Sequence, residues 1–303
     1  MKSRFFFPAV IFTSVVLFIC CNKDNTEKHS TEQLKQELTI LNGSISESIG
    51  ITFDNTKGFW SAVGKVCAVA GADMTGAYAG AQVGGEIGAY VGAVAGNPPA
   101  GAAIGATAGA VICGVGASYS AGQALKNSKN LDNPYPNGYN SSLSSPYANN
   151  NNIGFLHNKY LDLIFTMNNE VTPTDVYQHL FEDLCEYSLF DGLFQKIGPE
   201  TQIHQDVSKI STTYISLDYN IDYLISEYGK ILDFPESITN IWLYFFNAFS
   251  SVETIEDAYM VVDTYIEWLD NNGKEYVSPE EYIAFQYAFN TALHSINYWS
   301  FLN

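Results

Sequence analysis

A step of four residues between glycines is the feature that most restricts how this chain can fold. Six glycines keep the step without a gap and three more continue it after a short break: Gly76, Gly80, Gly84, Gly88, Gly92, Gly96, Gly101, Gly105 and Gly109. A spacing of four places successive residues on one stripe of a helix. Glycine destabilises a helix by about 1 kcal/mol relative to alanine, so the stripe must be offset by the close approach of another helix.

The segment Asn97-Pro98-Pro99 interrupts this pattern, because proline lacks a backbone donor and forces the preceding residue out of helical space. We therefore expect a glycine-zipper hairpin within residues 58–126, with helices near 59–96 and 100–125. A turn at Pro98 would place Cys113 opposite about Val83. Cys67 and Cys113 would then lie several turns apart, so we interpret both as packing residues and not as a disulfide.

The hairpin has two alternative environments. Residues 100–125 contain no charged side chain, and 26 residues at 1.5 Å each reach about 39 Å, more than the roughly 30 Å hydrocarbon core of a bilayer. Alanine and glycine are only weakly apolar, however, and Glu86 lies within the first helix. The hairpin either enters a membrane in some state or is buried beneath the downstream helices of a soluble protein.

The N-terminus predicts export. Lys2 and Arg4 precede an apolar run over residues 5–19, and polar sequence follows from Asn22, which indicates a signal peptide over residues 1–20. The run ends in Leu17-Phe18-Ile19-Cys20-Cys21, which resembles a bacterial lipoprotein box. That resemblance implies a lipid on Cys21, with Cys20 as the alternative, and an outer-membrane or cell-surface location. A simple secreted protein is the other interpretation.

Two polar stretches separate the expected modules. Residues 21–57 predict a polar tether with one short helix. Ser30 and Gln33 have the spacing of a capping box ahead of three leucines. The Asn22-Lys23-Asp24-Asn25 start of this tether looks like the export tag of Bacteroidota surface lipoproteins. Residues 127–152 are rich in Asn, Ser and Pro and predict a linker.

Residues 153–303 predict an aromatic-rich, acidic α-helical domain, so the whole chain is expected to be all-α. Residues 151–303 hold 23 acidic residues and 5 lysines, and such a charge excludes nucleic-acid binding through a basic surface. Caps at Thr172, Thr254 and Ser278 mark helix starts. We expect helices near 155–168, 173–188, 203–229, 235–250, 254–270 and 279–300.

A motif opens this domain. The segment Ile153-Gly154-Phe155-Leu156-His157-Asn158-Lys159-Tyr160-Leu161-Asp162 resembles a motif found in a family of Bacteroidota lipoproteins that also carry a glycine zipper upstream. The resemblance implies a location in the cell envelope and no particular activity. Asn158 and Asp162 share a helix face. We expect His157, Asn158 and Asp162 to cap or dock this helix against the hairpin, with a ligand site as the alternative.

Catalytic and metal-binding patterns were not found. The five histidines are scattered, and no cysteine pair has the spacing of a zinc site. Ser118 sits in a Gly-x-Ser-x-Ser sequence inside the hairpin, outside the strand context of a hydrolase nucleophile. The segment from Asp270 to Glu281 resembles a calcium loop, but Lys274 and Glu275 contradict it, so we interpret it as a turn followed by a helix cap.

We therefore expect a non-enzymatic envelope lipoprotein with no cofactor and no metal site. Its partners would be the membrane, through the lipid and the hairpin, and a second copy or another protein through the zipper. One alternative is a secreted antagonistic or pore-forming factor that inserts the hairpin into a target membrane. The other is a soluble helical interaction protein that buries the hairpin in its core.

Overall fold

The computed structural model describes residues 31–51, 62–129, 143, 145–148, 151–166, 173–184 and 193–300. Throughout these residues the regular secondary structure is helical and contains no strand, which confirms the all-α class. The named helices are α2 (Thr31–Ile49), α3 (Ala62–Val94), α4 (Pro98–Lys129), α5 (Ile153–Thr166), α6 (Pro173–Leu184), α8 (Gln202–Ser216), α9 (Ile221–Leu232), α10 (Glu236–Phe249), α11 (Ile255–Asn271) and α12 (Pro279–Trp299), with a 3₁₀ turn η1 (Gly273–Glu275).

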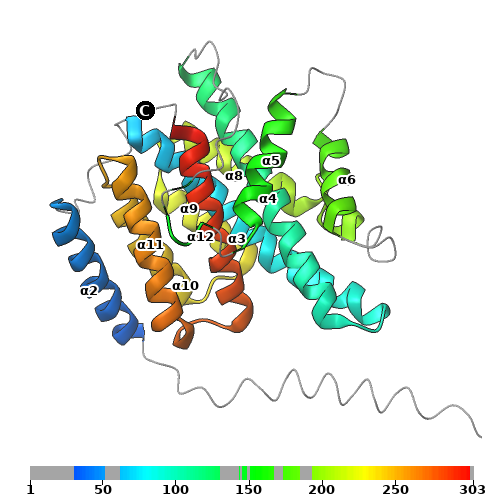
Figure 1. Ribbon diagram of the computed structural model, residues 1–303, viewed down its shortest axis with the longest axis horizontal. Coiled ribbons are helices and arrows are strands. Elements are labelled where there is room, and N and C mark those ends of the chain that lie inside the picture. Colours follow the sequence, from blue (N-terminus) through cyan, green and yellow to red (C-terminus); the bar gives the residue numbers. More distant parts are fainter. Residues whose placement is uncertain are drawn as a thin grey trace, which may run out of the picture.

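Helices α3 and α4 form the predicted antiparallel hairpin, and it runs through the middle of the molecule (Figure 1). Helix α12 packs along α3, and α8 packs along α4. Helix α5 contacts both α4 and α12, while α10 and α11 connect α12 to the peripheral α2. Helices from the C-terminal half of the chain therefore pack along both helices of the hairpin.

The helix starts follow the capping signals of the sequence. Ser278 and Glu281 form a reciprocal capping box at the start of α12, with Pro279 in its first turn. The Thr254 side chain accepts a hydrogen bond from the Asp257 backbone N–H at the start of α11. Helix α6 begins at Pro173 as predicted, whereas its expected cap Thr172 lies outside the described residues.

The single helix predicted over 203–229 is wrong, because the structure has two helices there. Helix α8 ends before Leu217, and α9 begins after Asn220. Asp218 and Tyr219 between them have φ angles of 52° and 64°, in the left-handed region that stops a helix. Asn220 then caps α9 by accepting a hydrogen bond from the Tyr223 backbone N–H. The apolar spacing continued across this break and concealed it.

Helix α2 is longer than the short helix expected within the polar tether. It buries Leu34, Leu38 and Ile45 against the C-terminal helices, and Asn42 donates a 2.9 Å hydrogen bond to the Tyr244 carbonyl of α10. Lys35 also pairs with Glu236 at the start of α10. The region predicted as tether thus contains a helix that docks on the body of the protein.

One hydrophobic core joins the hairpin to the C-terminal helices. Its largest ring cluster lies on α10, α11 and α12, where the rings of Trp242 and Phe285 are 4.9 Å apart and those of Phe245 and Tyr265 are 5.1 Å apart. Tyr78 of α3 extends the cluster into the hairpin, with its ring 4.8 Å from that of Phe285. The expected aromatic-rich body therefore packs directly on the hairpin.

Candidate functional site

The glycines of α3 and α4 bring the two backbones into direct contact. A methyl group added at Gly80 would lie 2.0 Å from the carbonyl oxygen of Gly109, and one added at Gly88 would lie 2.1 Å from that of Gly101. These distances are too short for any side chain, so the contact requires glycine. A methyl group would also be too close to a neighbour at Gly76, Gly84, Gly92 and Gly105. Eight of the nine predicted glycines therefore lie in the contact.

Gly96 is the exception, because it lies in the turn. Its φ is 81°, and no described atom would be within 4 Å of an added methyl group, so its role is to supply left-handed backbone. The predicted register is also wrong. Pro98 begins α4 instead of forming the turn, which places Cys113 against Gly76 and not opposite Val83. Cys67 and Cys113 are buried free thiols, as predicted.

The hairpin has two parts with different surroundings. We call residues 62–81 with 106–126 the base and residues 82–105 the tip. Most described side chains of the base are buried, whereas residues 93–99 of the tip are exposed. Val94 is 82% exposed and Tyr90 is 71% exposed. Between Glu86 and Lys126 the sequence has no Asp, Glu, Lys or Arg. The exposed end of the hairpin is thus uncharged.

Glycines on the outer side of the base admit rings from the surrounding helices. A methyl group at Gly71 would lie 2.7 Å from the Phe246 ring, and one at Gly122 would lie 2.8 Å from the Trp299 ring. At Gly85 of the tip, an added methyl group would have its nearest neighbour, the Ala106 side chain of α4, at an ordinary 3.6 Å. The outer glycines of the base therefore let the surrounding helices pack closely on the hairpin. The four-residue spacing of the other glycines did not predict this role.

Helix α4 has the length and composition of a membrane span from Pro98 to Lys126, and it is the one such helix in the part of the chain that the structure describes. The body nevertheless buries 72% of its most apolar stretch. A long apolar helix in the centre of a folded domain meets the same criteria, so the span by itself does not distinguish a core helix from a membrane helix.

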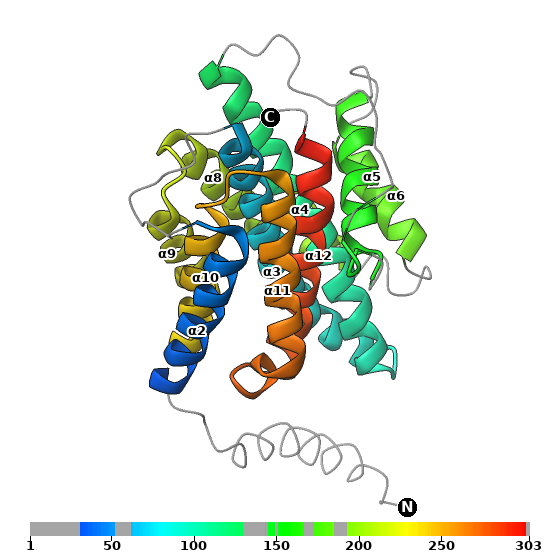
Figure 2. The ribbon, with the colours of Figure 1, turned by 60° about the vertical axis from the view of Figure 1, so that its left-hand side comes forward.

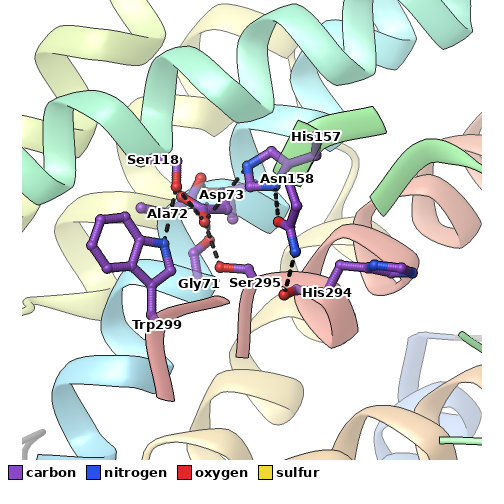
Figure 3. Close-up of polar contacts among 10 residues, drawn as sticks. Gly71, Ala72, Asp73, Ser118, His157, Asn158, His294, Ser295 and Trp299 are labelled. Carbon is purple, nitrogen blue, oxygen red and sulfur yellow. Dashed lines mark hydrogen bonds and ion pairs between the residues drawn. The ribbon is translucent and has the colours of Figure 1, made fainter. Parts of the chain in front are cut away.

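A buried polar cluster lies at the base, where α3, α4, α5 and α12 meet (Figure 3). Asp73 of α3 is fully buried, and its Oδ2 accepts hydrogen bonds from the hydroxyls of Ser118 at 2.8 Å and Ser295 at 2.5 Å. The Trp299 indole N–H donates to Ser118 Oγ at 3.1 Å. One carboxyl group thus connects three helices through hydrogen bonds.

The motif of α5 extends the cluster. His157 and Asn158 are fully buried, and His157 Nδ1 lies 2.8 Å from Asn158 Oδ1. Asn158 Nδ2 donates to the His294 carbonyl oxygen of α12 at 2.8 Å. A methyl group at Gly154 would lie 2.4 Å from the His294 ring. Asn158 and Gly154 therefore dock α5 on α12 and not on the hairpin as expected, whereas His157 faces Gly114 and Asp73 of the hairpin.

Burial favours the neutral forms of the two ionisable groups at the centre of the cluster. It raises the pKa of Asp73 to about 8, against the opposing effect of hydrogen bonds from Ser295, Ser118 and Trp299. It lowers the pKa of His157 to about 4. His157 Nε2 is 3.7 Å from Asp73 Oδ2, too far for a hydrogen bond. At pH 7 this is consequently a contact between two largely uncharged groups.

The cluster contains a serine, a histidine and an acid, but not in the geometry of nucleophilic catalysis. Ser118 donates to Asp73, whereas a nucleophilic serine would have to contact the histidine base. Asp73, Ser118 and His157 each have no exposed surface. The arrangement therefore acts as a hydrogen-bonded support for helix packing.

The remaining predicted site residues lie elsewhere. Asp162 is partly buried one turn after Asn158, and burial raises its pKa. Cys21 lies outside the described residues. In the calcium-like segment, Asp270 accepts a hydrogen bond from the Tyr282 hydroxyl, and Glu281 belongs to the capping box of α12. The interpretation of that segment as a turn followed by a cap is confirmed.

Comparisons with protein-family models, with curated proteins and with solved structures found no match. Sequence reasoning missed Asp73, Ser118, Ser295 and Trp299 as members of one cluster. One signal was available, because Asp73 is the only charged residue between Lys65 and Glu86 in a stretch of small apolar residues. An isolated acid in such a helix needs buried hydrogen-bond donors, but the sequence does not say which helix provides them.

Proposed function

We propose that this chain is a non-enzymatic envelope lipoprotein, anchored through Cys21 at the outer membrane or cell surface, that touches a lipid bilayer with the tip of its hairpin. The observation that carries the proposal is the end of the tip, residues 93–99, which is exposed and has no charged side chain. Val94 and Tyr90 are among the most exposed large apolar side chains of the described chain. Apolar side chains and a tyrosine at an exposed end suit the boundary between lipid and water.

Contact through the tip requires no change in the fold. Insertion of the whole hairpin would remove Tyr78 from its ring contacts and would separate Asp73 from Ser295. It would also expose the faces of α8 and α12 that now cover the base. Residues 93–99 of the tip are exposed, so this end can enter the surface of a bilayer while the base stays packed.

Vesicle flotation with a Cys21→Ala chain tests the proposal, since no lipid is then attached. We expect this chain to float with phosphatidylcholine vesicles and the doubly substituted Tyr90→Glu, Val94→Glu chain to remain at the bottom. Leu217→Glu is the matched control. Leu217 is 48% exposed and is the C-cap residue of α8, at a distance from the tip. Failure of the unsubstituted Cys21→Ala chain to float would overturn the proposal and favour a soluble helical interaction protein with a buried hairpin.

A pore-forming factor is the second candidate, because α4 has the length and composition that insertion of the hairpin would require. Release of a dye trapped in the same vesicles separates the two functions. Under the leading proposal the protein floats without releasing dye. Dye release that is lost on Gly88→Leu would instead support insertion of the whole hairpin.

A further inference from the structure

The start of α2 and the turn of the hairpin lie at the same end of the molecule. Both lie in the lower part of Figure 1 and Figure 2, with α2 on the left side of the molecule and the turn on the right. Helix α2 begins at Thr31, and the docking of α2 on α10 holds this start in place. The chain that leads back to Cys21 therefore joins the folded body at the end where the tip is exposed.

The length of chain before α2 limits where the anchoring membrane can lie. Nine residues lie between Cys21 and Thr31, so ten Cα-to-Cα steps join them, and a fully extended chain covers at most about 3.5 Å per step, or about 35 Å. Helix α3 has 33 residues and is about 50 Å long at 1.5 Å per residue. The chain is too short to carry an anchor from the start of α2 past the far end of the hairpin.

We infer that the tip contacts the same bilayer that holds the lipid of Cys21, so that the protein attaches to one membrane at two points. This inference rests on the proposed function and adds which membrane the tip meets. A lipid anchor and a small apolar contact reinforce each other, because the first holds the second at high local concentration.

Charge at this end selects the lipid. Glu32 and Glu280 are exposed and belong to the first turns of α2 and α12, whereas Glu236 at the start of α10 is paired with Lys35. Acidic residues there stabilise the helix starts, and they would repel an anionic membrane surface. The occupant that this end accepts is therefore a zwitterionic phospholipid surface, such as phosphatidylcholine.

A fluorescent probe on the tip tests the inference with the lipidated protein. An environment-sensitive dye is attached to the cysteine of a Val94→Cys variant. Cys67 and Cys113 are buried and should not react with the dye, and Cys185, which lies outside the described residues, is replaced by serine. The protein is inserted from outside into preformed phosphatidylcholine vesicles. We expect several-fold higher dye emission than in detergent-free buffer, no clustering of vesicles when bare vesicles are added, and a smaller rise when anionic lipid replaces part of the phosphatidylcholine.

The control carries the dye on Leu217→Cys. Leu217 follows Tyr214, which lies near Cys67 toward the start of α3, at the end away from the tip. Its emission should not change. If emission from the tip rises only after bare vesicles are added, and the vesicles cluster, the tip meets a second membrane; the inference then fails while the proposed function stands. If emission from the tip rises under neither condition, both fail.

Discussion

The base and the tip of the hairpin are alike on the inside and different on the outside. In both parts the glycines of α3 and α4 touch backbone to backbone, at Gly80 with Gly109 in the base and at Gly88 with Gly101 in the tip. In the base the outer glycines receive rings such as Phe246 and Trp299, whereas residues 93–99 of the tip are exposed. A glycine stripe thus closes the hairpin, but the surrounding helices determine which part of it is buried.

The largest effect is expected from an added methyl group inside the base. Gly80→Ala should lower the free energy of unfolding by about 3 kcal/mol or more, because the clash is with backbone and no rotamer relieves it. Gly88→Ala should have a smaller effect, about 1 to 2 kcal/mol, since the tip can open without exposing the core. Urea unfolding followed by circular dichroism measures both.

Gly85→Ala is the control for these two variants, because its methyl group makes only ordinary contacts. It should raise the free energy of unfolding by up to about 1 kcal/mol through better helix propensity. Equal destabilisation by Gly80→Ala and Gly85→Ala would contradict the inner glycine contact.

The motif of α5 provides the next test, because its contacts stabilise the base of the hairpin and not the tip. Asn158→Ala removes the donor to the buried His294 carbonyl and should cost about 2 kcal/mol of folding free energy. Lys159→Ala, at the next position, removes an exposed ammonium that lies 5.0 Å from the Tyr160 ring and should cost less than about 1 kcal/mol. If the two variants unfold at the same urea concentration, the docking role is wrong.

The pH dependence of stability tests the burial of Asp73. The folded chain keeps this proton up to about pH 8, whereas the unfolded chain releases it near pH 4, so stability falls by about 1.4 kcal/mol per pH unit in between. Burial lowers the pKa of His157 and of His204 to about 4. These two groups therefore make stability rise with pH, up to about pH 6.5.

The effect of Asp73 should therefore stand out between pH 6.5 and 8, as a loss of about 2 kcal/mol. Asp73→Asn keeps an acceptor for Ser118 and Ser295 and should remove this loss. Thermal unfolding of both proteins across this interval makes the comparison. The same slope in the variant would show that Asp73 is ionised in the folded protein.

The smallest effect is expected at the exposed end. Val94→Ala should change the free energy of unfolding by less than about 0.5 kcal/mol, because this side chain is 82% exposed. Val111→Ala, the same substitution in the fully buried base, should cost about 2 kcal/mol. Comparable losses from the two variants would mean that the tip is covered in solution.

Local rules predicted much of this fold. The caps at Thr254 and Ser278 mark the starts of α11 and α12 because each satisfies backbone donors within the same turn. The same rules missed the break between α8 and α9, since the left-handed residues Asp218 and Tyr219 are neither glycine nor proline. They also misplaced the register of the hairpin, because Pro98 can start a helix as readily as it can end one.

The candidate site was predictable only in part. The sequence indicated that His157 and Asn158 dock α5, and it isolated Asp73 as an acid among small residues. It could not identify Ser118, Ser295 and Trp299 as their neighbours, since these residues come from two helices separated by more than 170 positions. Hydrogen bonds over such separations depend on the final packing and leave no local pattern.

By itself, the sequence determined that two glycine-striped helices would form a hairpin and that the chain would be all-α, because helix periodicity, capping and glycine spacing act over a few residues. Only the tertiary structure decided which half of the hairpin is covered. That outcome depends on whether rings from α10 and α12 reach the outer glycines of the base.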